Sequence, residues 1–230
     1  FGGAFTGIYQ ATHGFFRFAA ADTASEAFKP KAISWVLAGG LLGALIGPEV
    51  VRVTADYFAP IPFAGAYASI VAINLAGAIG ILFLDIPKPP RRAKGASSGR
   101  LLGEIFRQPE TLVAVVCAMV SFALMTLVMT STSLAMGGQG FSTAHAADVV
   151  RWHVVAMFGP SFFTGSIISR FGHLPVIGVG LLLLGIAGVT AVSGVELENF
   201  YLALISLGLG WNFSFIGATS LLGTTHTAVE

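Results

Sequence analysis

The chain has 230 residues, of which 55% are hydrophobic and only 10% charged, and its net charge is +1. This composition, with a mean hydropathy of +0.82, excludes a soluble globular domain and predicts an all-α integral membrane protein. The near-neutral charge gives no indication of a nucleic-acid partner, and a single cysteine excludes an internal disulfide.

Seven stretches are long and apolar enough to cross a bilayer as helices of roughly 20 residues. They are residues 1–21, 32–51, 63–84, 111–136, 149–168, 174–192 and 200–222. The chain begins inside the first stretch, without Met or a signal peptide, and stops just after the last one. We therefore expect an internal fragment of a larger membrane protein.

Basic residues concentrate in two of the connections between these stretches. Lys29 and Lys31 lie in the first connection, and six more lie in the third: Lys88, Arg91, Arg92, Lys94, Arg100 and Arg107. Cytoplasmic loops of membrane proteins carry an excess of Lys and Arg, so both connections are predicted to be cytoplasmic. The Pro-, Ser- and Gly-containing segment 87–108 is then a basic cytoplasmic linker between two helical halves, 1–86 and 109–230.

The first stretch contains three polar side chains that share one helix face. Gln10 and His13 are three residues apart, and Arg17 follows His13 by four. Polar groups at membrane depth face protein or a watery cavity rather than lipid. Two interpretations stay open: helix packing with a snorkelling Arg17, or a stripe that lines a cavity.

The second stretch ends in the glycine-rich segment 39–48 (GGLLGALIGP), whose small residues predict close helix packing and whose proline favours a kink. This segment resembles the glycine-rich motif in the fifth helix of major facilitator superfamily transporters. The linker resembles their central loop, and 165–172 (GSIISRFG) resembles their signature between the eighth and ninth helices. The resemblance implies the major facilitator fold, with the fourth to tenth of twelve helices present.

The fourth and fifth stretches carry a pattern of soft donor atoms. Met125 and Met129 are four residues apart, as are His153 and Met157, so each helix presents two donors on one face. At matching depths in an antiparallel hairpin they would form two tiers, and thioether with imidazole suits Cu(I). The alternatives are plain packing by the methionines, and a packing or proton-relay role for His153.

The same four residues resemble the Met-x-x-x-Met and His-x-x-x-Met patterns of the CcoA-like copper importers within this superfamily, and so does 152–165 (WHVVAMFGPSFFTG). The resemblance implies a bacterial inner-membrane transporter that imports copper for haem-copper oxidase assembly. Copper would be the transported substrate, with no permanent cofactor, and its partners would be a periplasmic copper donor and a cytoplasmic acceptor. Cys117 stands where the family has a cysteine, but Ser121 replaces the second thiol of a pair.

The last stretch carries Trp211 and Asn212 near its middle. By resemblance to the superfamily they face Gln10 and His13 across a central cavity. This arrangement supports an alternative function, the transport of an organic solute such as riboflavin or a drug.

Two other classes of function find no support in the sequence. A retinal photoreceptor needs a lysine within a span, and all four lysines lie in predicted loops. No nucleophile with a suitably spaced base points to an enzyme.

Overall fold

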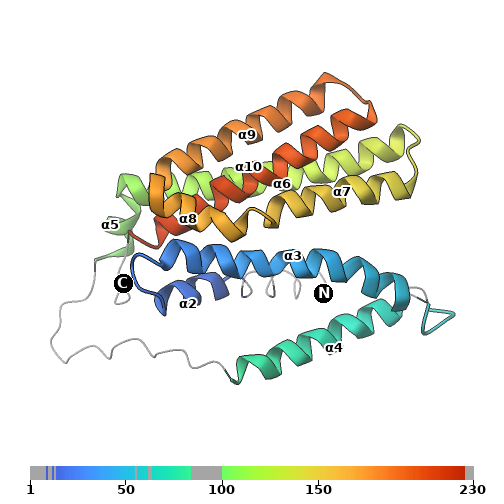
Figure 1. The fold of residues 1–230 in the computed structure, drawn as a ribbon, viewed down its shortest axis with the longest axis horizontal. Helices are drawn as coiled ribbons and strands as arrows, with labels where there is room; N and C mark the ends of the chain where they lie inside the picture. The colour runs from blue at the N-terminus through green and yellow to red at the C-terminus, as the bar shows by residue number, and fades with distance from the viewer. Residues whose placement is uncertain are drawn as a thin grey trace.

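In the computed structural model the described residues are 9, 12, 14–54, 56–61, 64–83 and 100–225, without the side chains of residues 48, 52 and 143. Their regular structure is α-helical. The helices are α2 (Phe16–Asp22), α3 (Lys29–Thr54), α4 (Ala64–Ile81), α5 (Leu102–Phe106), α6 (Pro109–Gly138), α7 (Thr143–Phe158), α8 (Ser161–Phe171), α9 (His173–Ser193) and α10 (Leu197–Leu222) (Figure 1). Gln10, His13 and most of the linker lie outside the described residues.

Six stretches of the described helices are long and apolar enough to span a membrane. They are Lys29–Val51, Ala64–Ile81, Pro109–Gly138, Ala144–Phe171, His173–Ser193 and Leu197–Leu222. These stretches match the second to seventh predicted spans, so the predicted all-α membrane architecture is confirmed. The first predicted span lies mostly outside the described residues, and α2 forms its described end.

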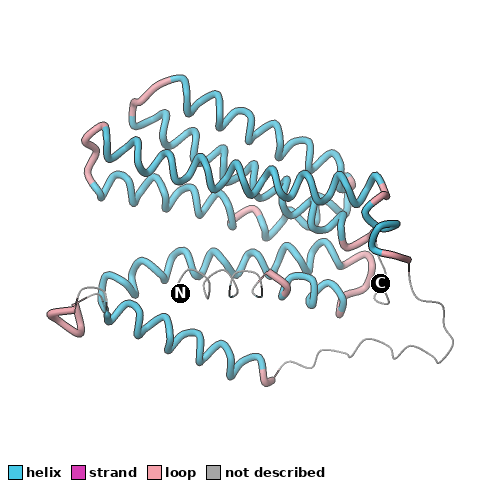
Figure 2. The backbone as a smooth tube through the Cα atoms, turned by 180° about the vertical axis from the view of Figure 1, so that it is seen from behind, coloured by secondary structure: helices cyan, strands magenta, loops and turns pink. Residues whose placement is uncertain are grey.

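The fifth predicted span differs from expectation because it is not one continuous helix. It consists of α7 and α8, interrupted between Phe158 and Ser161, and the interruption is visible as a short loop inside the upper layer of Figure 2. Pro160 causes it, since proline has no N–H to donate to the carbonyl four residues earlier.

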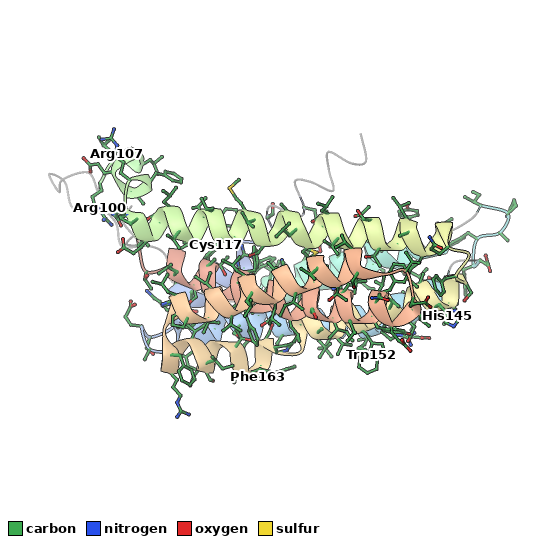
Figure 3. The ribbon with its side chains drawn as sticks, turned by 90° about the horizontal axis from the view of Figure 1, so that it is seen from above. Arg100, Arg107, Cys117, His145, Trp152 and Phe163 are labelled. Atoms are coloured by element: carbon green, nitrogen blue, oxygen red, sulfur yellow. The ribbon has the colours of Figure 1, made fainter. Side chains whose placement is uncertain are left out.

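The helices form two layers (Figures 1 and 2). In one layer α10 packs against α9, α6 and α7, while α6 and α7 contact each other only sparsely. The other layer contains α2, α3 and α4, and α3 joins the layers by packing on α8 and α7. Arg100 and Arg107 lie at one end of the molecule and His145 at the other (Figure 3). We call the first the basic end, and it is the side predicted to be cytoplasmic.

Glycines let α10 occupy the centre of its layer. A Cβ added to Gly180 on α9 would lie 2.3 Å from the backbone nitrogen of Ser214, and one added to Gly208 on α10 would lie 2.5 Å from the carbonyl oxygen of His153. Only a residue without a side chain permits such close approach between helix backbones. The hydroxyl of Ser121 on α6 donates to Ser214 Oγ at 2.7 Å, which adds a hydrogen bond on the third side.

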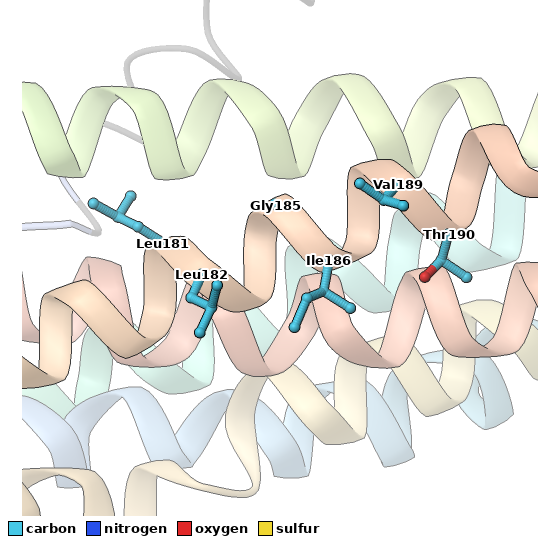
Figure 4. Close-up of a pocket in the computed structure, with 6 residues that line it drawn as sticks. All are labelled: Leu181, Leu182, Gly185, Ile186, Val189 and Thr190. Atoms are coloured by element: carbon cyan, nitrogen blue, oxygen red, sulfur yellow. The ribbon is translucent and has the colours of Figure 1, made fainter.

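Most glycines of the segment 39–48 contact nothing in the part of the chain that the structure describes. Among the described residues, nothing lies within 4 Å of a Cβ added to Gly43 or Gly47 on α3, whereas one added to Gly40 would lie 2.7 Å from the Phe158 ring. On α9, Gly188 is equally open. The same helix carries a shallow apolar groove, lined by Leu181, Leu182, Gly185, Ile186, Val189 and Thr190 (Figure 4). Such a lining suits lipid tails or another helix rather than a polar solute.

The two glycine environments on α9 give a first prediction. Gly180→Ala forces a methyl group against the α10 backbone and should destabilise the transporter by about 1–3 kcal/mol, as overpacking does. Gly188→Ala meets no atom and improves helix propensity by up to about 1 kcal/mol. Thermal unfolding in detergent should therefore show a lower midpoint for Gly180→Ala and an equal or higher one for Gly188→Ala. Equal midpoints for the two variants would contradict the close contact of α9 with α10.

Candidate functional site

The two layers meet through direct hydrogen bonds at the basic end. Ser34 on α3 donates its hydroxyl to the carbonyl oxygen of Ser161 on α8, and the backbone N–H of Gly165 donates to Ser34 Oγ at 3.1 Å. A Cβ on Gly165 would lie 2.6 Å from the carbonyl oxygen of Pro30. Further along α3 the layers touch at Gly40, whereas no described atom lies within 4 Å of a Cβ added to Gly43. Contact between the layers is therefore tightest at the basic end.

Aromatic rings from three helices converge just beyond this contact. The rings of Trp211 and Phe215 on α10 are stacked, with centroids 4.8 Å apart and planes 16° apart. Phe158 at the end of α7 packs edge-on against Trp211 at 5.9 Å, and Phe122 on α6 lies 6.2 Å from Phe215. The guanidinium carbon of Arg17 on α2 lies 4.7 Å from the centre of the Phe215 ring. We call these five residues the aromatic cluster.

Two buried N–H groups of the aromatic cluster have no hydrogen-bond partner among the described residues. Arg17 Nε and Trp211 Nε1 make no hydrogen bond to any part of the chain that the structure describes. Buried N–H groups are almost always paired, because an unmade hydrogen bond costs about 1–3 kcal/mol. Two unpaired donors beside stacked rings therefore suit a flat molecule that brings hydrogen-bond acceptors.

Asn212 is next to Trp211 but uses its amide inside the protein. Nδ2 donates to the carbonyl oxygen of Met157 and to Ser161 Oγ, each at 2.7 Å, and Oδ1 accepts from Thr164 Oγ1 at 2.6 Å. The Met157 carbonyl can only accept, which fixes the orientation of the amide. The side chain is fully buried, and it joins α10 to both sides of the interruption between α7 and α8.

His153 is fully buried on α7. Its Nδ1 lies 2.8 Å from the carbonyl oxygen of Leu204 on α10, and because a carbonyl only accepts, Nδ1 carries a proton. In the neutral ring Nε2 is then unprotonated and carries a lone pair, and this nitrogen has no hydrogen-bond partner in the described part of the chain. A histidine held this way by a backbone carbonyl is also the usual arrangement of a metal ligand.

The three methionines of the predicted copper path are half-buried. Met129 packs against the apolar cluster that contains Leu204, the residue that positions His153. Met157 lies against α10, since its backbone nitrogen is 2.9 Å from a Cβ placed on Gly208. Met125 lies one turn nearer the basic end of α6 than Met129. Because α10 is the main neighbour of both α6 and α7, the two helices do not form the closely packed hairpin assumed in the prediction.

Cys117 lies away from these donors. It is half-buried and packs against the cluster of Ala114, Ile177, Ala218 and Leu221 near the basic end. Gln10 and His13, predicted to line a cavity with Trp211 and Asn212, fall outside the described residues. Within the described part of the chain, no three His, Cys, Asp or Glu side chains gather in a way that could hold a metal ion.

Sequence reasoning missed most of the aromatic cluster. The sequence indicates two of its five residues, Arg17 as a snorkelling or cavity-lining residue and Trp211 as a cavity residue by resemblance to the superfamily. Phe122, Phe158 and Phe215 are three of 19 phenylalanines, and nothing in their spacing distinguishes them from lipid-facing ones.

Comparison with known proteins assigns the family. Residues 1–228 match the sequence model of the Major Facilitator Superfamily. The chain is 42% identical over 225 residues to the riboflavin transporter RfnT of Brucella anthropi, covering 97% of this chain and 56% of that protein. Two uncharacterized MFS-type transporters of Bacillus subtilis, YddS and YdeG, are 30% and 27% identical over 93% of this chain, which covers 53% and 54% of their lengths.

The chain thus spans about half the length of the curated relatives it matches. The family model, by contrast, covers nearly all of it, and the six apolar helices agree with a multi-pass membrane protein. The chain belongs to the major facilitator superfamily.

Proposed function

We propose that this chain is the solute-contacting part of a secondary transporter for a flat, ring-containing organic molecule, with riboflavin as the first compound to test. The observation that carries the proposal is the aromatic cluster, in which stacked rings and two unpaired donors lie where α2 of one layer meets α10 of the other. The 42% identity to a riboflavin transporter supports it.

Riboflavin matches the chemistry of the cluster. Its ring system is flat and bears carbonyl oxygens and ring nitrogens that accept hydrogen bonds. Offset stacking of aromatic rings contributes about 0.5–1.5 kcal/mol beyond burial. Trp211 Nε1 and Arg17 Nε would donate to acceptors on the ring edge, and these bonds would remove the cost of leaving two buried donors unpaired.

Removing the indole N–H while keeping an aromatic ring tests this contact. Trp211→Phe in the complete transporter should raise the KM for riboflavin uptake about three- to tenfold, the effect of losing one hydrogen bond of about 0.5–1.5 kcal/mol. Trp152→Phe is the matched control, because Trp152 is half-exposed on α7 and belongs to no described aromatic pair. Uptake by cells with equal amounts of each variant in the membrane is the measurement. An unchanged KM for Trp211→Phe would remove Trp211 from the solute site.

A second candidate function is the copper import predicted from the sequence, and one observation favours it. His153 Nε2 is buried and carries a free lone pair, while Nδ1 donates to the carbonyl oxygen of Leu204, as in many metal sites. Met129 packs near the same stretch of α10. The names of the relatives give this function no support, and we place it second.

The copper path has its own test. If it operates, Met125→Ala, Met129→Ala, His153→Ala and Met157→Ala should each lower cellular uptake of radioactive copper at least about tenfold, the effect of losing roughly 1.4 kcal/mol of binding. Met119→Ala and Met136→Ala serve as controls, since Met119 is exposed and Met136 is packed in the apolar core. The amount of each variant in the membrane, and its thermal unfolding midpoint in detergent, report folding. Unchanged copper uptake in all four variants would assign the methionines to packing.

A further inference from the structure

The interruption between α7 and α8 leaves backbone groups that a continuous helix would satisfy. Pro160 has no N–H, and the N–H of Phe162 reaches back only three residues, to the carbonyl of Gly159 at 3.4 Å. Inside a membrane such groups need a partner from protein. The carbonyl oxygen of Met157, next to the interruption, accepts a hydrogen bond from Asn212 Nδ2.

Asn212 bonds to both sides of the interruption. It contacts Met157 before it, and Ser161 and Thr164 after it, with two donated bonds and one accepted bond. The side-chain amide of asparagine supplies two N–H donors on Nδ2 and an acceptor on Oδ1. Asn212 is therefore saturated by the protein, and this use of the amide is distinct from contact with a solute.

The interruption also lies between the aromatic cluster and the contact of α3 with α8. Phe158, the last residue of α7, packs on Trp211 in the aromatic cluster and against Gly40 of α3. Ser161, the first residue of α8, accepts the hydroxyl of Ser34 through its carbonyl. Only Gly159 and Pro160 separate these two contacts.

We propose that Asn212 is a positioning residue that links occupation of the aromatic cluster to the contact between α3 and α8 at the basic end. A solute that moves Trp211 or Phe158 shifts the chain at the interruption, and Asn212 carries this shift to Ser161 and Thr164. The α8 backbone then leaves Ser34, and the contact opens. The identity of the aromatic cluster as the solute site rests on the proposed function, but the role of Asn212 in holding the contact closed does not.

A buried residue at the contact can report its opening. Ile33 on α3 is 1% exposed and packs in the apolar cluster with Ile168 of α8. In a complete transporter whose other cysteines, Cys117 included, are replaced by serine, Ile33→Cys should react with a membrane-impermeant maleimide only while the contact is open. Vesicles of both orientations establish from which side the reagent arrives.

Asn212→Ala should raise the labelling rate of Ile33→Cys about tenfold, the change expected for a loss of roughly 1.4 kcal/mol from a buried hydrogen-bond network. Asn199→Ala is the matched control on the same helix, since the amide of Asn199 makes an exposed hydrogen bond to Ser193 at 3.2 Å. For riboflavin uptake, Asn212→Ala should lower the maximal rate and leave KM nearly unchanged, whereas a solute-contacting residue would change KM.

The labelling experiment needs no solute, so its outcome is independent of whether riboflavin is the substrate. Wild-type labelling of a correctly folded Asn212→Ala transporter would overturn the proposal, and so would an equal increase in Asn199→Ala. If Asn212→Ala does not reach the membrane, Thr164→Val gives a second test, because it keeps the shape of Thr164 and removes the hydroxyl that contacts Asn212 Oδ1 and the Pro160 carbonyl. Wild-type labelling of Thr164→Val would then overturn the proposal as well.

Discussion

The close approach of α10 to three neighbouring helices is the constraint on which the site depends. Inside a bilayer the hydrophobic effect does not press helices together, so packing and interhelical hydrogen bonds must do so. Here Gly180 and Gly208 bring the backbones of α9 and α7 against α10, and Ser121 bonds to Ser214 from α6. With α10 fixed in this way, Trp211, Asn212 and Phe215 occupy set positions between the two layers.

Neighbouring side chains on α10 then serve different purposes. Trp211 presents a ring and an unpaired N–H to the aromatic cluster, whereas Asn212 is turned into the layer and bonds across the interruption of α7 and α8. Successive residues of a helix point about 100° apart, which allows this division. One turn of α10 thereby contacts both the proposed solute and the segment that meets α3.

Hydropathy predicted the spans well, because the need to satisfy backbone groups in lipid leaves a long apolar stretch few alternatives to helix. It could not predict the interruption at Gly159 and Pro160, since proline is tolerated in membrane helices where other groups satisfy the freed backbone, and here that group is Asn212 of another helix. The copper prediction assumed that α6 and α7 pack side by side, but α10 is the main neighbour of both. The aromatic cluster joins residues about 200 positions apart, such as Arg17 and Phe215, and spacing within single helices carries no information about such pairs.

If the aromatic cluster is the solute site, a flat organic molecule, rather than a metal ion, binds between the layers. Titration of riboflavin into the purified complete transporter, followed by quenching of the riboflavin's own fluorescence on stacking with Trp211, tests this most directly. We expect saturable quenching that excess Cu(I) does not abolish. Absence of saturable quenching by folded protein, together with stoichiometric binding of Cu(I), would rule out the aromatic cluster as a flavin site and favour the path through His153.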